Sequence, residues 1–251
     1  MAKQAHERGR YFLKDSIRLS VDFSSTDQSR GLPAPPIEKP CPPGAARLPL
    51  PPVGRWQGIG SIDLTAAIAG RQSHRRFRPE PLTLDELSYL LWATQGVRAR
   101  PSAYSALRTV PSAGCRHAFE TYVCALAVQG LAVAVYRYLP LAHELVLERQ
   151  MERLGERLGA AALRQTFVGR AAATFVWSAI PYRMEWRYGA AAHKVIALDA
   201  GHVCQNLYLA CAAIGAGTCA VAAYHQQQMD DLLGLDGEEE FVIYLAPVGK
   251  V

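Results

Sequence analysis

Two short stretches of the sequence combine residue types that can hold a flat or anionic ligand. The first, residues 70–81, reads Gly-Arg-Gln-Ser-His-Arg-Arg-Phe-Arg-Pro-Glu-Pro and places four arginines within eight positions. Arginine presents a planar fork of N–H donors that matches a phosphate group. The second, residues 108–117, contains the turn Pro111-Ser112-Ala113-Gly114, whose backbone N–H groups can approach a ligand closely. Together the stretches favour a phosphate-bearing small molecule as ligand.

The composition argues against several other ligands. The net charge of +5 comes mainly from arginine, but the arginines are dispersed apart from residues 71–78, and no basic stripe is interleaved with aromatic residues. We therefore expect no nucleic acid as partner. The six cysteines include no Cys-x-x-Cys pair and have no histidines at metal-site intervals, so we expect reduced structural cysteines and no metal. Cys115 differs from the others because it lies within the second stretch.

The sequence shows no membrane or export segment. No apolar run approaches the ~20 residues that span a bilayer, and residues 1–10 lack the apolar core of a signal peptide. We expect a cytoplasmic protein without membrane contact. With 50% apolar and 20% charged residues, the 251-residue chain can bury a substantial core.

Two predicted helices hold the ends of the first stretch. Residues 61–69 form a helix with Ser61 as N-cap and Gly70 just past its end. A second helix begins at Thr83, where Thr83-x-x-Glu86 forms a capping box. The arginine-rich residues 71–78 are therefore expected in a turn between two helices.

The remaining elements predict an α+β fold, because helices and strands do not alternate strictly. Residues 193–214 form the longest predicted helix, which is apolar on more than one side and should be buried all round, centrally or in a dimer interface. We expect 218–224 to be a short strand or loop. Further strands are predicted at 119–128, 133–138, 144–148, 172–180 and 241–248, and further helices at 152–166 and 229–233.

A proline-rich arm precedes the domain. Nine of the sixteen prolines fall between residues 31 and 60, which predicts extended chain. Leu48, Leu50, Val53 and Trp56 make this segment too apolar for a free tail. We expect residues 1–60 to form an arm and residues 61–251 to form the domain. The arm would pack on its own body or on a partner subunit, and in a dimer we expect it to cross onto the partner.

Both stretches resemble the nitroreductase family of FMN proteins, in which an Arg-x-Ser-x-Arg/Lys element and a Pro-Ser loop grip the flavin. The sequence is similar in particular to the SagB-type branch, dehydrogenases of azoline-forming peptide clusters. That likeness is carried by residues 111–114 with His117, by Trp186-Arg187-Tyr188-Gly189 and by residues 199–206. The resemblance runs from about residue 61 to the C-terminus. It implies the nitroreductase fold, a central and mostly antiparallel sheet flanked by helices, in a homodimer with FMN at the interface.

The resemblance also implies roles for individual residues. Arg71 and Ser73 would hold the phosphate side, and Arg75 would reach the ribityl and pyrimidine end. The loop of Pro111, Ser112, Ala113 and Gly114 would approach the flavin from the second subunit. The remaining cofactor-binding candidates are Gln72, Arg108, Lys250, and the main chain of Val221, Ala222 and Ala223.

The activity implied by the resemblance is that of an FMN-dependent oxidoreductase. It would transfer hydride through flavin N5 by a ping-pong mechanism, with NAD(P)H as a possible transient reductant, and Tyr188 and His117 as catalytic proton donors. His117 could equally be a structural donor. Azoline-to-azole oxidation of a peptide is the alternative. Arg187 weakens it, because the branch commonly has lysine there and arginine is a poor general base. A flavin-bound subunit without turnover is a further alternative.

Overall fold

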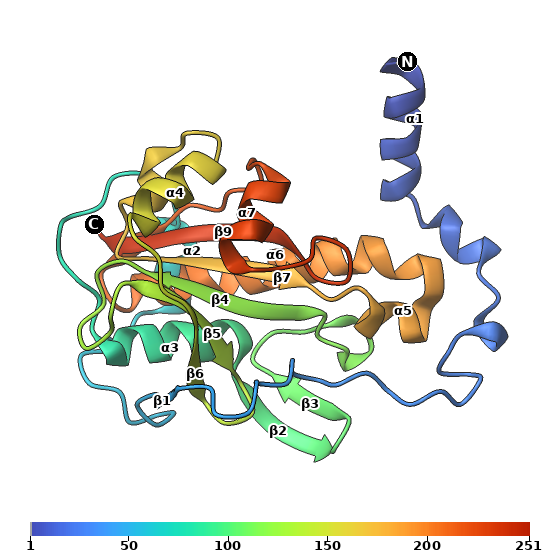
Figure 1. Cartoon of the computed structure of the whole chain (residues 1–251), viewed down its shortest axis with the longest axis horizontal. Helices are drawn as coiled ribbons and strands as arrows, with labels where there is room; N and C mark the ends of the chain where they lie inside the picture. Colours follow the sequence, from blue (N-terminus) through green and yellow to red (C-terminus); the bar gives the residue numbers. More distant parts are fainter. Residues whose placement is uncertain (1) are drawn as a thin grey trace.

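A seven-stranded sheet lies at the centre of the protein, whose computed structural model describes residues 2–251. The spatial order is β1-β6-β5-β4-β7-β9-β8, and each neighbouring pair is antiparallel (Figure 1). This arrangement confirms the predicted α+β class and the antiparallel sheet. The strands are β1 (Arg47–Pro49), β4 (Phe119–Ala125), β5 (Ala134–Leu139), β6 (Glu144–Arg149), β7 (Ala173–Ala179), β8 (Ala216–Thr218) and β9 (Phe241–Lys250).

Helices cover both faces of the sheet, and β4 shows how the sequence permits this. Val123 and Ala125 belong to an apolar cluster shared with α3 and α6, whereas Tyr122 and Cys124 belong to a second cluster shared with α4 and α7. Successive side chains of a strand point to opposite faces, so a strand buried on both faces is a continuous apolar run. The helices of these layers are α3 (Leu84–Gln95), α4 (Leu154–Ala161), α6 (Ala192–Ala212) and α7 (Gln226–Leu233).

The helix boundaries follow local capping chemistry, which corrects two predictions. The capping box at Thr83 and Glu86 is confirmed at the start of α3. The preceding helix, α2 (Leu64–Gly70), begins three residues later than predicted, because the Asp63 side chain rather than Ser61 caps it by accepting from Ala66 N–H. The helix predicted at 152–166 ends at Ala161, and the next turn is broken by the left-handed backbone of residues 163 and 164.

The long helix α6 is not buried all round within the chain, so of the two predicted alternatives the central one is wrong, and burial in a dimer interface stays a prediction. One face packs into the core through residues such as Ile196 and Leu207. The opposite face is open, and Leu198 on it is 54% exposed. The apolar character that suggested complete burial therefore leaves an uncovered surface on the single chain.

Several elements of the structure were not predicted, among them β1, β8 and three larger features. These are α1 (Ala2–Leu13), the two-stranded hairpin of β2 (Val97–Ser102) and β3 (Ser105–Arg108), and α5 (Tyr182–Tyr188). The hairpin precedes the Pro111 loop, and α5 carries the Trp186–Tyr188 segment. Both therefore position residues that the sequence had singled out.

The proline-rich arm packs largely on its own body. Residues Arg47–Pro49 add β1 to the edge strand β6, and Leu50 is buried. The Trp56 ring lies 5.3 Å from Tyr89 and 5.2 Å from Trp92, centre to centre. Leu50 and Trp56, which were expected to draw the arm onto a partner, thus find a surface within the chain, whereas Val53 stays exposed. The crossing of the arm onto a partner stays a prediction.

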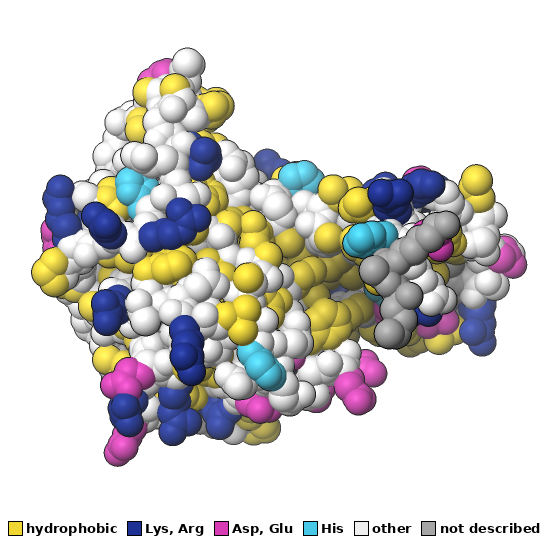
Figure 2. Space-filling model, turned by 90° about the horizontal axis from the view of Figure 1, so that it is seen from above, with side chains coloured by type: hydrophobic (Ala, Val, Ile, Leu, Met, Phe, Trp, Pro, Cys, Tyr) yellow, Lys and Arg dark blue, Asp and Glu magenta, His cyan; other side chains and the backbone are white. Residues whose placement is uncertain are grey.

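The first residues of the arm behave differently from the rest. Helix α1 contacts the short 3₁₀ segment Asp15–Ser20 and stands clear of the body (Figure 1). Tyr11, Phe12 and Leu13 at its end are exposed. Figure 2 shows apolar side chains gathered in the hollow beside this helix.

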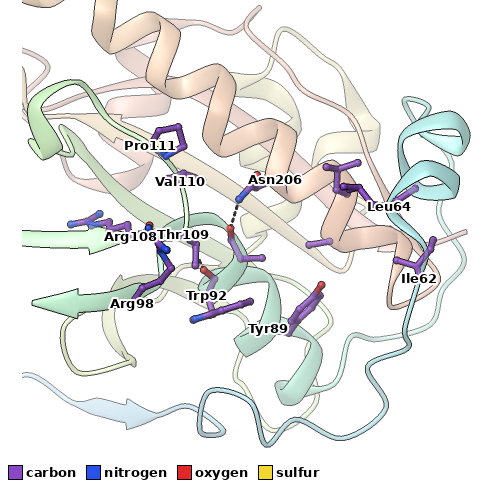
Figure 3. A pocket seen from close by; sticks show the side chains of 14 residues that line it. Ile62, Leu64, Tyr89, Trp92, Arg98, Arg108, Thr109, Val110, Pro111 and Asn206 are labelled. Carbon is purple, nitrogen blue, oxygen red and sulfur yellow. Dashed lines mark hydrogen bonds between the residues drawn. The ribbon is translucent and has the colours of Figure 1, made fainter.

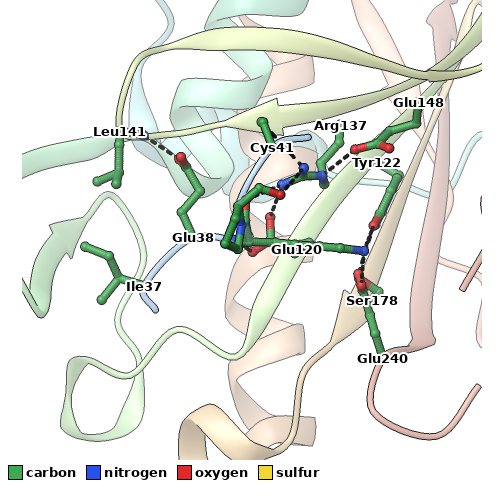
Figure 4. A network of polar contacts seen from close by, with 12 residues as sticks. Ile37, Glu38, Cys41, Glu120, Tyr122, Arg137, Leu141, Glu148, Ser178 and Glu240 are labelled. Atoms are coloured by element: carbon green, nitrogen blue, oxygen red, sulfur yellow. Dashed lines mark hydrogen bonds and ion pairs between the residues drawn. The ribbon is translucent and has the colours of Figure 1, made fainter. Parts of the chain in front are cut away.

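A buried polar network fastens the middle of the arm to the sheet (Figure 4). Glu120 of β4 accepts from the Lys39 backbone N–H at 2.8 Å and pairs with Arg183 at 2.5 Å and Arg137 at 3.4 Å. Arg137 also donates to the carbonyls of Lys39 and Pro40. Because Glu120 is 2% exposed, its charge depends on these partners rather than on water.

Replacing Glu120 with glutamine tests the network. We expect Glu120→Gln to lower the free energy of unfolding by roughly 3–5 kcal/mol at pH 7, because it leaves the buried Arg183 guanidinium without a counter-charge and Arg137 with Glu148 alone. Glu156→Gln, which removes an exposed ion pair with Arg153, is the control and should change the free energy of unfolding far less, because water screens exposed charges. Urea denaturation measures both, and equal losses would contradict the assignment.

The pH dependence of this contribution has a definite sign. Burial raises the pKa of Glu120, but Arg183 and Arg137 outweigh burial and hold it below its ordinary value. The stabilisation is therefore present above about pH 4.3, where the unfolded carboxyl ionises, and is lost as the pH falls through the folded-state pKa.

Candidate functional site

The arginine-rich stretch is laid along the last strands of the sheet. The backbone N–H of His74 donates to Thr218 O at 2.9 Å, and that of Arg78 donates to Lys250 O at 2.9 Å. A Cβ on Gly217 would lie 2.6 Å from the His74 ring, so glycine is needed for this approach. The chain from Arg71 to Arg78 is thereby fixed while the side chains of Arg71 and Arg75 stay exposed.

Tyr208 of α6 joins this stretch to the segment after β8. Its hydroxyl lies 2.9 Å from Ser73 Oγ and accepts from Ala220 N–H at 2.8 Å. The Arg71 guanidinium stacks 5.3 Å from the Tyr208 ring centre. Sequence reasoning missed Tyr208 because its role arises from this packing. We call Arg71, Ser73, Tyr208 and Ala220 the arginine cluster.

Several other candidate residues near the arginine cluster already use polar groups in hydrogen bonds within the protein. Val221 pairs its N–H and C=O with Leu245, whereas Ala222 and Ala223 are exposed residues, and the Ala223 carbonyl accepts from Gln165 Nε2 at 2.8 Å. Lys250 donates from Nζ to Glu86 at 2.5 Å and to Ile214 O at 2.7 Å. Gln72 is exposed and lines, with Arg71, a cavity of about 120 Å³ between α2, α6 and β8.

The Pro111 loop is held in an unusual backbone conformation. Gly114, Cys115 and His117 all have positive φ, at 58°, 58° and 48°. Non-glycine residues adopt this region at a cost and cluster at functional sites. Ser112 Oγ accepts from the His117 N–H at 2.9 Å, which closes the loop on itself.

Two elements outside the loop brace it. Asp199 of α6 accepts from Ala113 N–H at 3.2 Å. From α5, a Cβ on Gly114 would lie 2.5 Å from the Tyr188 hydroxyl and 2.9 Å from Arg187 Nε. We call residues 111–117 with Tyr188 and Asp199 the loop cluster. The structure thus brings together the predicted loop and both catalytic candidates, Tyr188 and His117.

His117 is buried and neutral. Burial, reinforced by the nearby charge of Arg108, lowers the pKa of His117 to about 3. Its Nε2 lies 3.5 Å from Cys115 Sγ. At neutral pH the imidazole therefore cannot act as a cationic acid.

Arg108, expected as a further phosphate ligand, is engaged within the protein. It is 3% exposed and donates to Gln95 Oε1 and to Ile37 O, each at 2.7 Å. Burial lowers the pKa of Arg108 to about 10, which leaves it charged at neutral pH. Its bond to Ile37 makes it a second anchor of the arm.

The arginine cluster and the loop cluster do not face one another within the chain. Tyr208 and Asp199 are nine residues apart on α6, which is about 13 Å along the axis and half a turn around it. A cavity of about 630 Å³ beside α6 reaches from Pro111 to Leu64, with Tyr89 and Trp92 in its wall (Figure 3). Its lining is mainly apolar, and Leu64 at its edge is 63% exposed.

The described residues 2–251 contain neither a cluster of metal ligands nor a membrane-spanning helix. This part of the chain contains no group of three or more His, Cys, Asp or Glu side chains placed to hold a metal ion. No helix in it has the length and apolar character that crossing a bilayer requires. The cysteines are free thiols.

Comparisons with known proteins agree with the fold. The nitroreductase family model matches residues 68–250. The protein MJ1384 of Methanocaldococcus jannaschii, named as a candidate nitroreductase, is 34% identical over 192 residues, covering 76% of this chain and 93% of that protein. The solved structure of a candidate nitroreductase from Ralstonia eutropha has a TM-score of 0.68 at 29% identity, covering 88% of this chain and 99% of that one. The expected nitroreductase fold is therefore confirmed.

Two more distant solved structures share the fold. The Escherichia coli microcin synthetase complex McbBCD, with truncated pro-MccB17 bound, matches with a TM-score of 0.61 at 19% identity, over 80% of this chain and 78% of that one. The NADPH:FMN oxidoreductase of Vibrio harveyi, complexed with NAD+, matches with a TM-score of 0.52 at 18% identity, over 74% and 67%. At these identities the likeness concerns the fold alone.

The neutral state of His117 predicts a pH dependence of stability. Between pH 7 and pH 5 the imidazole of the unfolded chain, with a pKa near 6.5, takes up a proton that the folded chain excludes. His117 should therefore reduce the free energy of unfolding by roughly 2 kcal/mol over that interval. We expect His117→Gln to lack this part of the loss, while the exposed-residue control His6→Gln retains it. Urea denaturation at pH 7 and pH 5 measures the change in the free energy of unfolding for the unmodified protein and both variants. An equal change in all three proteins would refute the assignment.

Proposed function

Because the chain belongs to the nitroreductase family of oxidoreductases, we propose that it is an FMN-dependent oxidoreductase. The observation that carries the proposal is the arginine cluster. Arg71 is an exposed guanidinium stacked on Tyr208, next to the Ser73 hydroxyl, and among the described residues it makes no ion pair. A fixed cation beside hydroxyl donors and small residues suits a phosphate monoester.

The residues present fit FMN. Arg71 and Ser73 would hold its phosphate, and Arg75 would reach the ribityl and pyrimidine end. The main chain of the exposed residues Ala222 and Ala223 would meet the ring edge. Lys250 would support the site indirectly, because its ammonium already pairs with Glu86.

Bound FMN would supply hydride acceptance and donation at N5, which suits a ping-pong exchange between a reductant such as NAD(P)H and a second substrate. The chain's own residues would bind, orient and protonate. Tyr188 places a phenol hydroxyl against the Pro111 loop and is the candidate proton donor. Neutral His117 supports that loop from within. The Vibrio harveyi relative, described as an NADPH:FMN oxidoreductase with NAD+ bound, supports this choice of cofactor and reductant.

We further propose that the protein acts as a homodimer. The arginine cluster and the loop cluster lie on opposite faces of α6, so one flavin cannot contact both clusters of the same chain. If both clusters contact one flavin, they must therefore come from different chains. The exposed Leu198 on α6 and Leu64 on α2 offer apolar surface for a second copy. The site would then be complete only at the interface between two subunits.

Azoline oxidation remains the second candidate, favoured by the fold shared with the McbBCD complex. It would need a proton acceptor near the flavin ring. Arg187 stands where azoline oxidases of the SagB-type branch commonly have lysine, and it cannot serve as a base. A flavin-bound subunit without turnover would bind FMN equally well but would show no bleaching by a reductant.

Flavin content tests the proposal. We expect a yellow protein that releases FMN on heating, is bleached anaerobically by NAD(P)H and is reoxidised by a nitroaromatic compound. Arg75→Ala should weaken FMN binding about tenfold to a hundredfold, the value of a charge-assisted bond. Arg78→Ala, an equally exposed arginine outside the matched element, is the control. A colourless protein that cannot be reconstituted with FMN would sink the proposal.

The free helix α1 gives a test of the dimer. We propose that its exposed Tyr11, Phe12 and Leu13 pack on the second subunit. Deleting residues 2–13 should weaken dimerisation and lower flavin occupancy together, while the unfolding midpoint of the body stays the same, because the segment Asp15–Ser20, which contacts Gly189–Ala191, is kept. Residues 26–56 must be kept, because they are packed on the body. Sedimentation velocity over a concentration series measures the association, and an unchanged dimer constant would count against this role.

A further inference from the structure

Two guanidinium groups meet beside the Pro111 loop without an acidic partner. Arg116 follows the left-handed turn of the loop, and Arg187 lies near the end of α5. Arg187 Nε would be 2.9 Å from a Cβ on Gly114, and Arg116 Cζ lies 4.7 Å from the centre of the Trp186 ring. Within residues 2–251, neither arginine has a carboxylate within 4 Å.

The acidic side chains on the same elements are already engaged. Glu120 of β4 pairs with Arg183 and Arg137, and Glu185 of α5 lies 2.8 Å from His193 Nε2. Asp199 of α6 accepts from Ala113 N–H in the same loop, but within residues 2–251 no carboxylate pairs directly with Arg116 or Arg187. Arg183 adds a third guanidinium, which Glu120 already neutralises.

Arg116 is the buried member of the pair. It is 6% exposed, its Nε donates to Arg183 O at 3.2 Å, and its Nη2 is buried without a hydrogen-bond partner. Burial and the neighbouring charge of Arg187 lower the pKa of Arg116. A buried cation without a counter-charge is costly, and an anion bound at the neighbouring Arg187 would lower that cost through its charge.

Arg187 is the exposed member, and its side chain is oriented. Its Cζ lies 5.6 Å from the centre of the Tyr188 ring, and the Gly114 backbone limits it on another side. A guanidinium held in this way offers two parallel N–H donors to an incoming oxyanion. Lysine at this position would offer a single point charge instead.

We propose that Arg187, supported by the buried charge of Arg116, forms an anion subsite that takes a carboxylate or phosphate group of the substrate. The inference rests on the proposed function, because the subsite borders Gly114 and Tyr188, where that function places the substrate. It narrows the substrate class to acidic molecules. An azoline ring is neutral and has no such group, so in azoline oxidation the subsite would have to bind an acidic group elsewhere on the peptide.

Calorimetric titration of the purified protein, as isolated, tests the subsite without requiring turnover. Benzoate, phenyl phosphate and the neutral isostere benzamide serve as probes. We expect at least one anionic probe to bind about ten times or more tightly than benzamide, and Arg187→Gln to remove this preference. Arg187→Lys should keep part of it. Arg157→Gln, an exposed arginine on the distant helix α4, is the matched control and should keep all of it.

The outcomes show which kind of anionic group the subsite binds. Tighter binding of benzoate assigns a carboxylated substrate, tighter binding of phenyl phosphate assigns a phosphorylated one, and equal tightening shows that the subsite responds to charge. Binding no tighter than benzamide, or a preference that survives Arg187→Gln, overturns the proposal. Flavin content is measured on the same samples. An anion preference in a protein that cannot bind FMN would therefore defeat the proposed function alone, whereas FMN binding without the preference would defeat the subsite alone.

Discussion

The Glu120 carboxylate is the interaction on which the most separate parts of this protein depend. It lies on β4 in the centre of the sheet and contacts the arm through Lys39, β5 through Arg137 and α5 through Arg183. A buried charge of this kind contributes little net stability compared with an apolar replacement, but it tolerates the loss of a partner poorly. Its effect is to fix the position of α5, and α5 carries Arg187 and Tyr188. The contacts of Glu120 with the arm and with β5 therefore help to fix the geometry of the loop cluster, through the position of α5.

Helix α6 imposes the second constraint, because it presents different chemistry on its two sides. Asp199 holds the Pro111 loop on one side, and Tyr208 holds Ser73 and Ala220 on the other. A single chain can thus build each half of the proposed flavin site and still be unable to close it. The proposed homodimer rests on this geometry, and the exposed Leu198 next to Asp199 on α6 agrees with it.

Much of the fold could be predicted from local patterns, because those patterns have local causes. The capping box at Thr83 and the apolar run of β4 are both confirmed. Helix α5 and the β2–β3 hairpin could not be found in this way, since tertiary contacts decide them. The same limit applies to the site. The exposure of Arg71 fits its predicted role, whereas the engagement of Arg108 by Gln95 and Ile37 depends on residues far away in the sequence.

The separation of α1 from the body has a thermodynamic consequence. A helix of twelve residues without tertiary contacts is marginal in water, so little within its own chain holds α1 in one conformation. The contacts made by the surface that covers α1 must offset the conformational entropy that α1 loses when it becomes ordered. Part of the binding free energy is then used to order the arm, so association through α1 is weaker than its contact area suggests. The same coupling makes that association more sensitive to temperature than the packing of the arm at Leu50 and Trp56, which is ordered within the chain.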